Sequence, residues 1–168
     1  MLLSCHLLGC GFHLRGVGDE LKFENLKNIQ VYLAVANDDE LFHQQLQRDL
    51  KFANTHLIDD VNSADWHLII LSVKTEKNSV GIDRNGRSNE YEVKMEVEFI
   101  VGSQSMLDDV KGVIGENTNN RVLSVSRNVY FDNNDQIGQR SEEKNILAAM
   151  RAELSKRVIN SFFISVTK

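Results

Sequence analysis

The chain has 168 residues, of which 42% are hydrophobic and 26% charged, and its formal net charge at pH 7 is −5. This length and hydrophobic content suit one core, so we expect a single domain over residues 25–168. The 19 Lys and Arg residues are spread along the chain without a basic run, which argues against nucleic-acid binding. No stretch approaches the roughly 20 apolar residues of a transmembrane helix.

The N-terminus carries an incomplete lipoprotein signal. Residues 1–9 are fairly apolar and end in Leu8 and Gly9, directly before Cys10. A small residue before cysteine after an apolar run is typical of bacterial lipoproteins, in which Cys10 would become the acylated mature N-terminus. Because a basic n-region is missing, we interpret residues 1–9 as a truncated signal-peptide remnant and residues 10–24 as a lipidated tether. The alternative is a frayed N-terminus with an incidental cysteine.

The first half of the domain alternates strands with a helix. Residues 29–35 have the period-two apolar pattern of a strand. Asn37 is a good N-cap for an amphipathic helix over about residues 38–53. Residues 56–60 can form a short extended piece, and the near-continuous apolar run 66–73 predicts a strand buried on both faces.

A long hairpin follows, with a tight turn at Asn85 and Gly86. After the turn, apolar and charged residues alternate strictly, which predicts a strand with one buried and one charged face. The apolar positions are Tyr91, Val93, Met95, Val97, Phe99 and Val101, and the charged ones are Glu90, Glu92, Lys94, Glu96 and Glu98.

The tip of this hairpin is a candidate anion site. A two-residue turn would place Arg84 opposite Arg87 and Val80 opposite Tyr91, with Ile82 on the same apolar face. Two opposed arginines repel each other unless an anion lies between them. Their position at the end of an apolar face suits an amphiphilic anion, and the alternative is two solvated arginines at a hairpin tip.

The register of the hairpin requires an extra residue farther from the turn. We expect a bulge between Thr75 and Ser79, because uninterrupted pairing would place a lysine on the apolar face. The bulge would instead pair Val73, Leu71 and Ile69 with Val97, Phe99 and Val101.

The last elements are a strand over residues 121–131 and a long amphipathic helix capped by Ser141, after a connection over residues 102–120. Arg140 would lie just before this helix, where its side chain could hold an anion at the helix N-terminus or remain solvated. The predicted fold is an α+β two-layer sandwich, with a mostly antiparallel sheet of about four strands and two helices on one face.

No motif for catalysis or cofactor binding is present. The five histidines show no ligand spacing with one another or with the two cysteines, so we expect no metal site. The paired carboxylates Asp59 and Asp60, and Asp108 and Asp109, would point apart on an extended backbone. We find no nucleophile elbow, phosphate-binding loop or dinucleotide fingerprint, and predict that the protein is not an enzyme.

Three stretches are similar to segments of one known family. The sequence GCGFHLR at residues 9–15 looks like its cleavage and anchor sequence. Residues 84–86, followed by Glu90 and Tyr91, look like its central hairpin, and residues 131–133 look like its last strand and turn. The chain thereby resembles the lipopolysaccharide-assembly lipoproteins of the LptE family, also called RlpB.

The resemblance implies a non-catalytic outer-membrane lipoprotein, acylated at Cys10 with palmitate among its lipids and lying in the periplasm and a barrel lumen. Such proteins bind lipopolysaccharide, and plug and support assembly of an LptD-type β-barrel that delivers it to the outer leaflet. Arg84 matches the family's hairpin arginine and Arg140 aligns with a basic position before its last helix. We therefore expect Arg84 to contact a lipopolysaccharide phosphate, with Arg87 and Arg140 assisting.

Two further expectations concern partners. We expect the charged strand face, including Glu92 and Glu96, and the exposed helix surfaces to contact the polar lumen of the barrel. The alternative function is a small soluble periplasmic ligand-binding or hydrolytic α+β domain whose Gly9 and Cys10 are coincidental.

Overall fold

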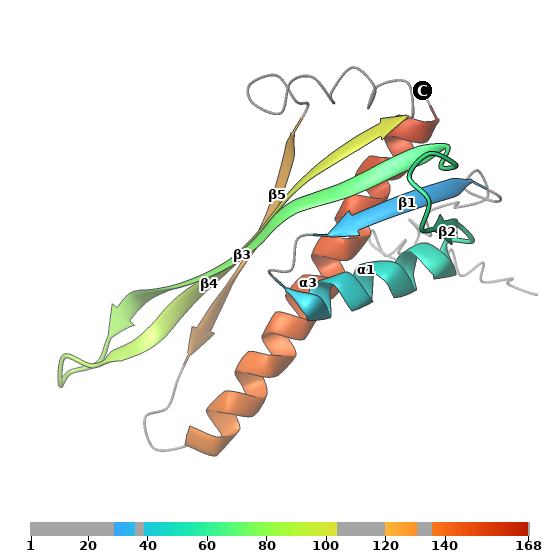
Figure 1. The fold of residues 1–168 in the computed structure, drawn as a ribbon. Helices are drawn as coiled ribbons and strands as arrows, with labels where there is room; N and C mark the ends of the chain where they lie inside the picture. Colours follow the sequence, from blue (N-terminus) through green and yellow to red (C-terminus); the bar gives the residue numbers. More distant parts are fainter. Residues whose placement is uncertain (1–28, 36–38, 104–119, 131–135, 168) are drawn as a thin grey trace, which may run out of the picture.

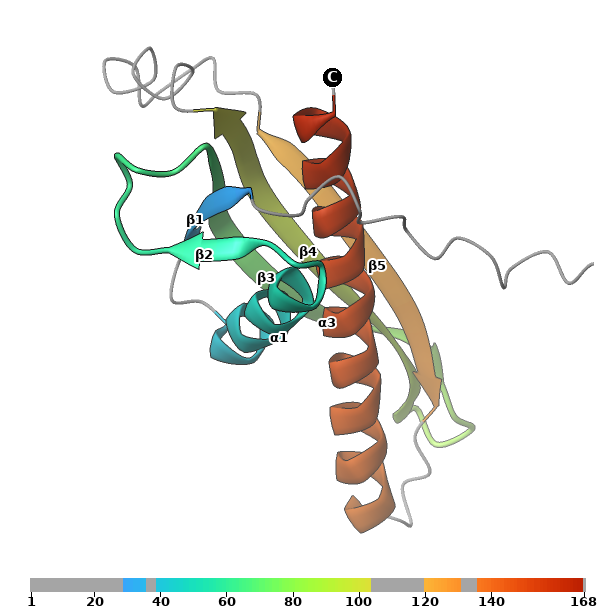
Figure 2. The same ribbon diagram turned by 90° about the vertical axis from the view of Figure 1, so that its right-hand side faces the viewer.

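The computed structural model describes residues 29–35, 39–103, 120–130 and 136–167, and in helix α3 it describes side chains from Arg140 onward. The described residues form a five-stranded sheet, in the order β2-β1-β3-β4-β5, with two helices on one face (Figure 1). The elements are β1 (Gln30–Val35), α1 (Glu40–Phe52), β2 (His56–Ile58), β3 (Trp66–Ile82), β4 (Ser88–Ser103), β5 (Arg121–Tyr130) and α3 (Gln136–Val166). The turned view shows both helices in front of the sheet (Figure 2).

The predicted α+β sandwich is confirmed, with a small difference in the sheet. The short piece at His56–Ile58 is a true strand, so the sheet has five strands instead of about four. β1 runs parallel to both β2 and β3, whereas β3, β4 and β5 are antiparallel. The sheet is therefore mixed. α1 is the crossover that carries the chain back to the end of the sheet where β1 begins, so β2 runs parallel to β1.

The core lies between the sheet and the helices. The alternation in β4 is confirmed, since its apolar positions from Val93 to Val101 are buried. α1 buries Phe42, Leu46 and Leu50, followed by Ala53, and α3 buries Met150, Leu154, Val158, Ile159 and Phe162. Leu41, in the first turn of α1, is 57% exposed.

The start of α1 differs from the prediction. The N-cap is Asp39, whose carboxylate accepts a hydrogen bond from the backbone N–H of Phe42 at 3.0 Å. Its backbone is extended, with φ −145° and ψ 95°, as an N-cap requires. The expected cap, Asn37, lies outside the described residues, and the helix begins at Glu40.

The start of α3 also differs. The helix begins at Gln136, so Arg140 and Ser141 lie within it and the predicted cap at Ser141 is wrong. No proline interrupts the residues before Ser141, and serine is tolerated inside a helix at a modest cost. The helix therefore continues N-terminal to the expected cap.

The register of β3 and β4 is partly as predicted. Val73 pairs with Val97, as expected, but the predicted bulge between Thr75 and Ser79 is wrong, because pairing is regular there. The register shifts instead at Leu71 and after Ser79. The residues opposite Phe99 and Val101 are therefore Ile70 and Leu68. An extra residue at Leu71 keeps these two side chains in the core.

Candidate functional site

The tip of the β3–β4 hairpin is a three-residue loop. The N–H of Asp83 donates to the carbonyl of Arg87 at 2.8 Å, and the N–H of Gly86 donates to the carbonyl of Asp83 at 3.0 Å. Gly86 has φ 76°, which only glycine adopts at little cost. The loop of Arg84, Asn85 and Gly86 replaces the predicted two-residue turn, and this length typically combines a type I turn with a left-handed residue.

The Asp83 side chain explains the longer loop. Its Oδ1 accepts hydrogen bonds from the N–H groups of Asn85 at 2.8 Å and Arg87 at 2.9 Å. The hydrogen bond from the Arg87 backbone is the largest cause that lowers the pKa of Asp83, and the Asn85 bond and the charge of Arg87 act in the same direction. The ionised carboxylate therefore stabilises the loop from inside.

The loop length changes the placement of the two arginines. Arg87 is opposite Asp83 and not opposite Arg84, because Arg84 is the first residue of the loop. Both arginine side chains are exposed. Arg84 and Arg87 are therefore not cross-strand neighbours, and the predicted repulsion between them, which would have required a bridging anion, does not arise. What remains is an exposed cationic tip.

The apolar residues near the tip are also placed differently. Tyr91 pairs with Ser79 and not with Val80, because of the register shifts on both sides of Gly81. Val80 and Ile82 are 51% and 71% exposed. The tip thus presents accessible apolar side chains beside cationic ones, instead of the end of a buried apolar face.

Arg140 does not lie before a helix, because it is the fifth residue of α3 and is exposed. The start of α3 and the hairpin tip lie toward the same end of the molecule in both views (Figures 1 and 2). Lys77 of β3 connects the two elements through an ion pair with Glu143 at 3.0 Å and also lies 4.9 Å from the ring centroid of Tyr91. The structure therefore brings the helix turn of Arg140 close to the hairpin, but no contact links Arg140 to Arg84 or Arg87 among the interactions of the described residues.

The face of β4 that points away from the helices is charged, as predicted. Its acidic residues are Glu90, Glu92, Glu96 and Glu98. Lys94 forms an ion pair with Glu96 at 2.9 Å, and this hydrogen bond and charge, with smaller contributions from Glu76 and Glu92, raise the pKa of Lys94. The face is therefore polar and predominantly acidic.

One constellation near the tip was not found from the sequence. A Cβ on Gly81 would lie 2.9 Å from the Cβ of Glu90, so this position of β3 leaves no room for a side chain. Glu90 accepts a hydrogen bond from Asn128 at 3.1 Å, and its hydrogen bond with Tyr130 raises the pKa of that hydroxyl. The only sequence signal was a glycine inside a strand, which often marks a close backbone approach.

The described residues contain no cluster of three or more His, Cys, Asp or Glu side chains that could hold a metal. Asp60 accepts hydrogen bonds from the Ser63 hydroxyl and the Asn62 N–H within one turn, which lower its pKa and give it a structural role. Neither described helix is long and apolar enough to cross a membrane. Cys10, the proposed tether and the pair at Asp108 lie outside the described residues.

Comparisons with known proteins agree with this architecture. The family model described as "LptE: Lipopolysaccharide-assembly" matches residues 29–162. No curated protein sequence matches the chain.

Several solved structures share the fold. The rare lipoprotein B from Shewanella oneidensis has a TM-score of 0.67 and 18% identity, covering 81% of this chain and 95% of its own. An uncharacterized lipoprotein B from Nitrosomonas europaea has a TM-score of 0.64 and 14% identity, covering 79% of this chain and 81% of its own. A minor lipoprotein from Acinetobacter baumannii has a TM-score of 0.61 and 16% identity, covering 82% and 92%.

Proposed function

Because the chain belongs to the LptE family of lipopolysaccharide-assembly proteins, we propose that it is a non-catalytic outer-membrane lipoprotein. In this proposal it binds lipopolysaccharide and plugs and supports assembly of an LptD-type β-barrel, which delivers lipopolysaccharide to the outer leaflet. Cys10 is the proposed lipid anchor. The observation that carries the proposal is the family match over residues 29–162, which includes the whole sheet and most of α3.

The hairpin tip supports the lipopolysaccharide part of the proposal. Arg84 and Arg87 are exposed and can donate hydrogen bonds to phosphate, while Val80 and Ile82 offer apolar surface for an acyl chain. Arg140 is exposed on a helix whose first turns lie toward the same end of the molecule. A ligand with both phosphates and acyl chains matches this combination of side chains.

The test is lipopolysaccharide affinity for Arg84→Glu and Arg87→Glu, measured at two salt concentrations. Each charge-assisted hydrogen bond contributes about 1.5 to 3 kcal/mol, so the loss of one guanidinium should weaken binding roughly tenfold or more. Arg48→Glu, at an exposed arginine of α1, makes the same charge change away from the tip and serves as the control. Equal affinity in all three variants and wild type would leave the tip arginines as solvated residues.

The charged face supports the barrel part of the proposal. The lumen of such barrels is polar, and an interface of charged and hydrogen-bonded groups fits a polar wall better than an apolar face would. Photo-crosslinkers at Glu92 and Glu96 should capture a β-barrel protein in outer-membrane extracts, and so should crosslinkers at the exposed Lys144 and Lys156 of α3. Capture from the helix alone would reject the sheet face as the contact.

A further inference from the structure

Strand β5 forms one edge of the sheet. Its register with β4 is regular from the pair Glu90 and Tyr130 to the pair Phe99 and Arg121, so all ten residues are paired without a bulge. On its outer side, no other described strand pairs with it. Long regular edges of this kind recruit additional strands unless something covers them.

Hydrogen bonds of β1 establish which of its residues direct their backbone N–H and C=O groups toward β3. The N–H of His56 donates to the carbonyl of Ile29 at 3.0 Å, so Ile29 faces β2. Gln30 faces β3, since its N–H donates to the Asp65 carboxylate at 3.0 Å and its carbonyl accepts from the Asp65 N–H at 3.0 Å. The backbone N–H and C=O groups of successive strand residues point to alternate sides of the strand. In the parallel register, the even-numbered residues of β3 therefore direct their N–H and C=O groups toward β1.

The same alternation carries across to β5. The odd-numbered residues of β3, such as His67, must bond to β4, where the partner is Gly102. The shift at Leu71 lies on β3 and leaves the alternation of β4 unchanged, so odd-numbered residues of β4 bond to β5. The residues of β5 with outward-facing N–H and C=O groups are therefore Val122, Ser124, Ser126, Asn128 and Tyr130.

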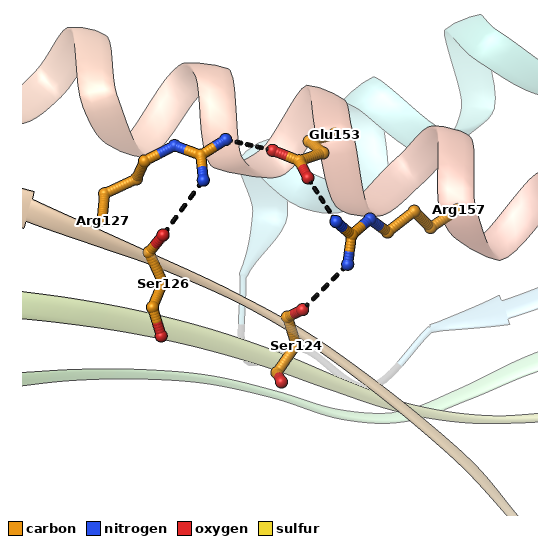
Figure 3. Close-up of polar contacts among 5 residues, drawn as sticks. All are labelled: Ser124, Ser126, Arg127, Glu153 and Arg157. Carbon is orange, nitrogen blue, oxygen red and sulfur yellow. Dashed lines mark hydrogen bonds and ion pairs between the residues drawn. The ribbon is translucent and has the colours of Figure 1, made fainter.

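Two of these outward carbonyls are covered by arginines. Arg157 of α3 donates from Nη1 to the carbonyl of Ser124 at 3.1 Å, and Arg127 donates from Nη1 to the carbonyl of Ser126 at 3.0 Å. Both guanidinium groups also bind the carboxylate of Glu153, which lies between them (Figure 3). We call Arg127, Glu153 and Arg157 the edge clamp.

We propose that the edge clamp keeps β5 closed against antiparallel pairing with β5 of a second copy of this chain. A two-fold pairing centred on Ser126 would place Ser124 opposite Asn128 and Val122 opposite Tyr130. None of these side chains is charged, and Val122 and Tyr130 are already 55% and 68% exposed. Aromatic and β-branched residues are favourable cross-strand partners, so the edge is self-complementary once its carbonyls are free.

The test is self-association of the full chain in mild detergent, measured by sedimentation velocity over a wide concentration range. The variant Arg127→Ala/Arg157→Ala removes the clamp and changes the net charge from −5 to −7, since two positive charges are lost. The control Lys144→Ala/Lys156→Ala makes the same change from −5 to −7 at exposed residues of α3 and keeps the clamp. We expect the clamp variant to dimerise at least about tenfold more tightly than wild type and the control to match wild type.

A third variant tests whether any dimer forms through the β5 edge. Ser126→Pro removes an outward N–H that the β4 ladder does not use, and proline is tolerated on edge strands for this reason. Added to the clamp variant, it should restore the monomer. A monomeric clamp variant, a control that dimerises equally, or a dimer that survives Ser126→Pro would each overturn the proposal.

The clamp variant should fold, because its ion pairs are about half exposed on the arginine side and contribute little stability. Circular dichroism and the melting temperature check this directly. If it does not fold, Arg157→Ala alone frees only the Ser124 carbonyl and should give weaker association that Ser126→Pro still abolishes. Absence of that association would equally reject the proposal.

Discussion

Asp39 caps α1 and at the same time forms an ion pair with Arg151 of α3, with 2.8 Å between Oδ2 and Nε. Both side chains are largely buried, at 13% and 16% exposed, so solvent screens the pair only weakly. One carboxylate therefore caps the start of α1 and also binds α3. Ser155 adds a second link, since its hydroxyl donates to Asp49 of α1 at 2.6 Å.

Substitutions of Asp39 should separate the stability that comes from the helix cap from the stability that comes from the ion pair with Arg151. Asp39→Asn keeps a capping oxygen and loses the ion pair, so we expect a loss of about 1 to 2 kcal/mol in the free energy of unfolding. Asp39→Ala loses both and should cost about 2 to 4 kcal/mol. Urea unfolding measures the difference. Equal losses for the two variants would show that the cap contributes nothing.

Gly81→Ala should destabilise the distal hairpin, because the new Cβ would lie 2.9 Å from the Cβ of Glu90. We expect a loss of about 1 to 3 kcal/mol, the usual range for overpacking. Glu90→Ala keeps the clashing Cβ and should not rescue the variant, whereas Glu90→Gly should rescue part of the loss. A double-mutant cycle from chemical denaturation gives the coupling, and zero coupling would place the strain elsewhere.

The hairpin tip should loosen in acid. Since hydrogen bonds lower the pKa of Asp83 in the folded protein below its ordinary value of 3.8, the carboxylate stabilises the loop above that value. This contribution is lost as pH falls through the lower folded pKa. The amide NMR signals of Asn85 and Arg87 should therefore shift in acid below pH 3.8, and Asp83→Asn should remove that shift. Signals that titrate identically in Asp83→Asn would assign the change to another group.

Cys10→Ala should abolish acylation and release the protein from membranes. The expectation rests on the apolar run that ends in Gly9 before the cysteine. Membrane fractionation with a radiolabelled fatty acid measures both effects, and Cys5→Ala is the matched control. A wild-type protein that is soluble and unlabelled would disprove the lipid anchor.

The sequence predicts the parts of this fold that repeat a pattern over many residues. The alternation along β4 is confirmed, and the last helix, predicted to be amphipathic, buries a stripe of side chains from Met150 to Phe162. β2 is only three residues long, and its pairing depends on tertiary contacts more than on its own pattern. The start of α3 was missed because Ser141 reads as a cap but is also tolerated within a helix.

The candidate site was predicted at the level of residue type and not of geometry. Arg84 is exposed in a hairpin tip, as expected, but it does not lie opposite Arg87 as we predicted. The error arose because Asn85 and Gly86 favour a two-residue turn, whereas the Asp83 side chain binds two backbone N–H groups and stabilises a longer loop. A local side-chain hydrogen bond thus decided a register that the apolar pattern alone could not.

The distal half of β3, from Lys74 to Val80, has only exposed side chains, although it pairs with β4 from Lys74 to Ser79. A segment with few buried contacts opens at a lower free energy than the global unfolding of the domain. Its amide protons should therefore exchange with solvent through subglobal opening, while those of β3 from His67 to Val73 exchange only when the whole core unfolds. The hairpin end can then adjust its twist to a bound partner without loosening the packing between sheet and helices.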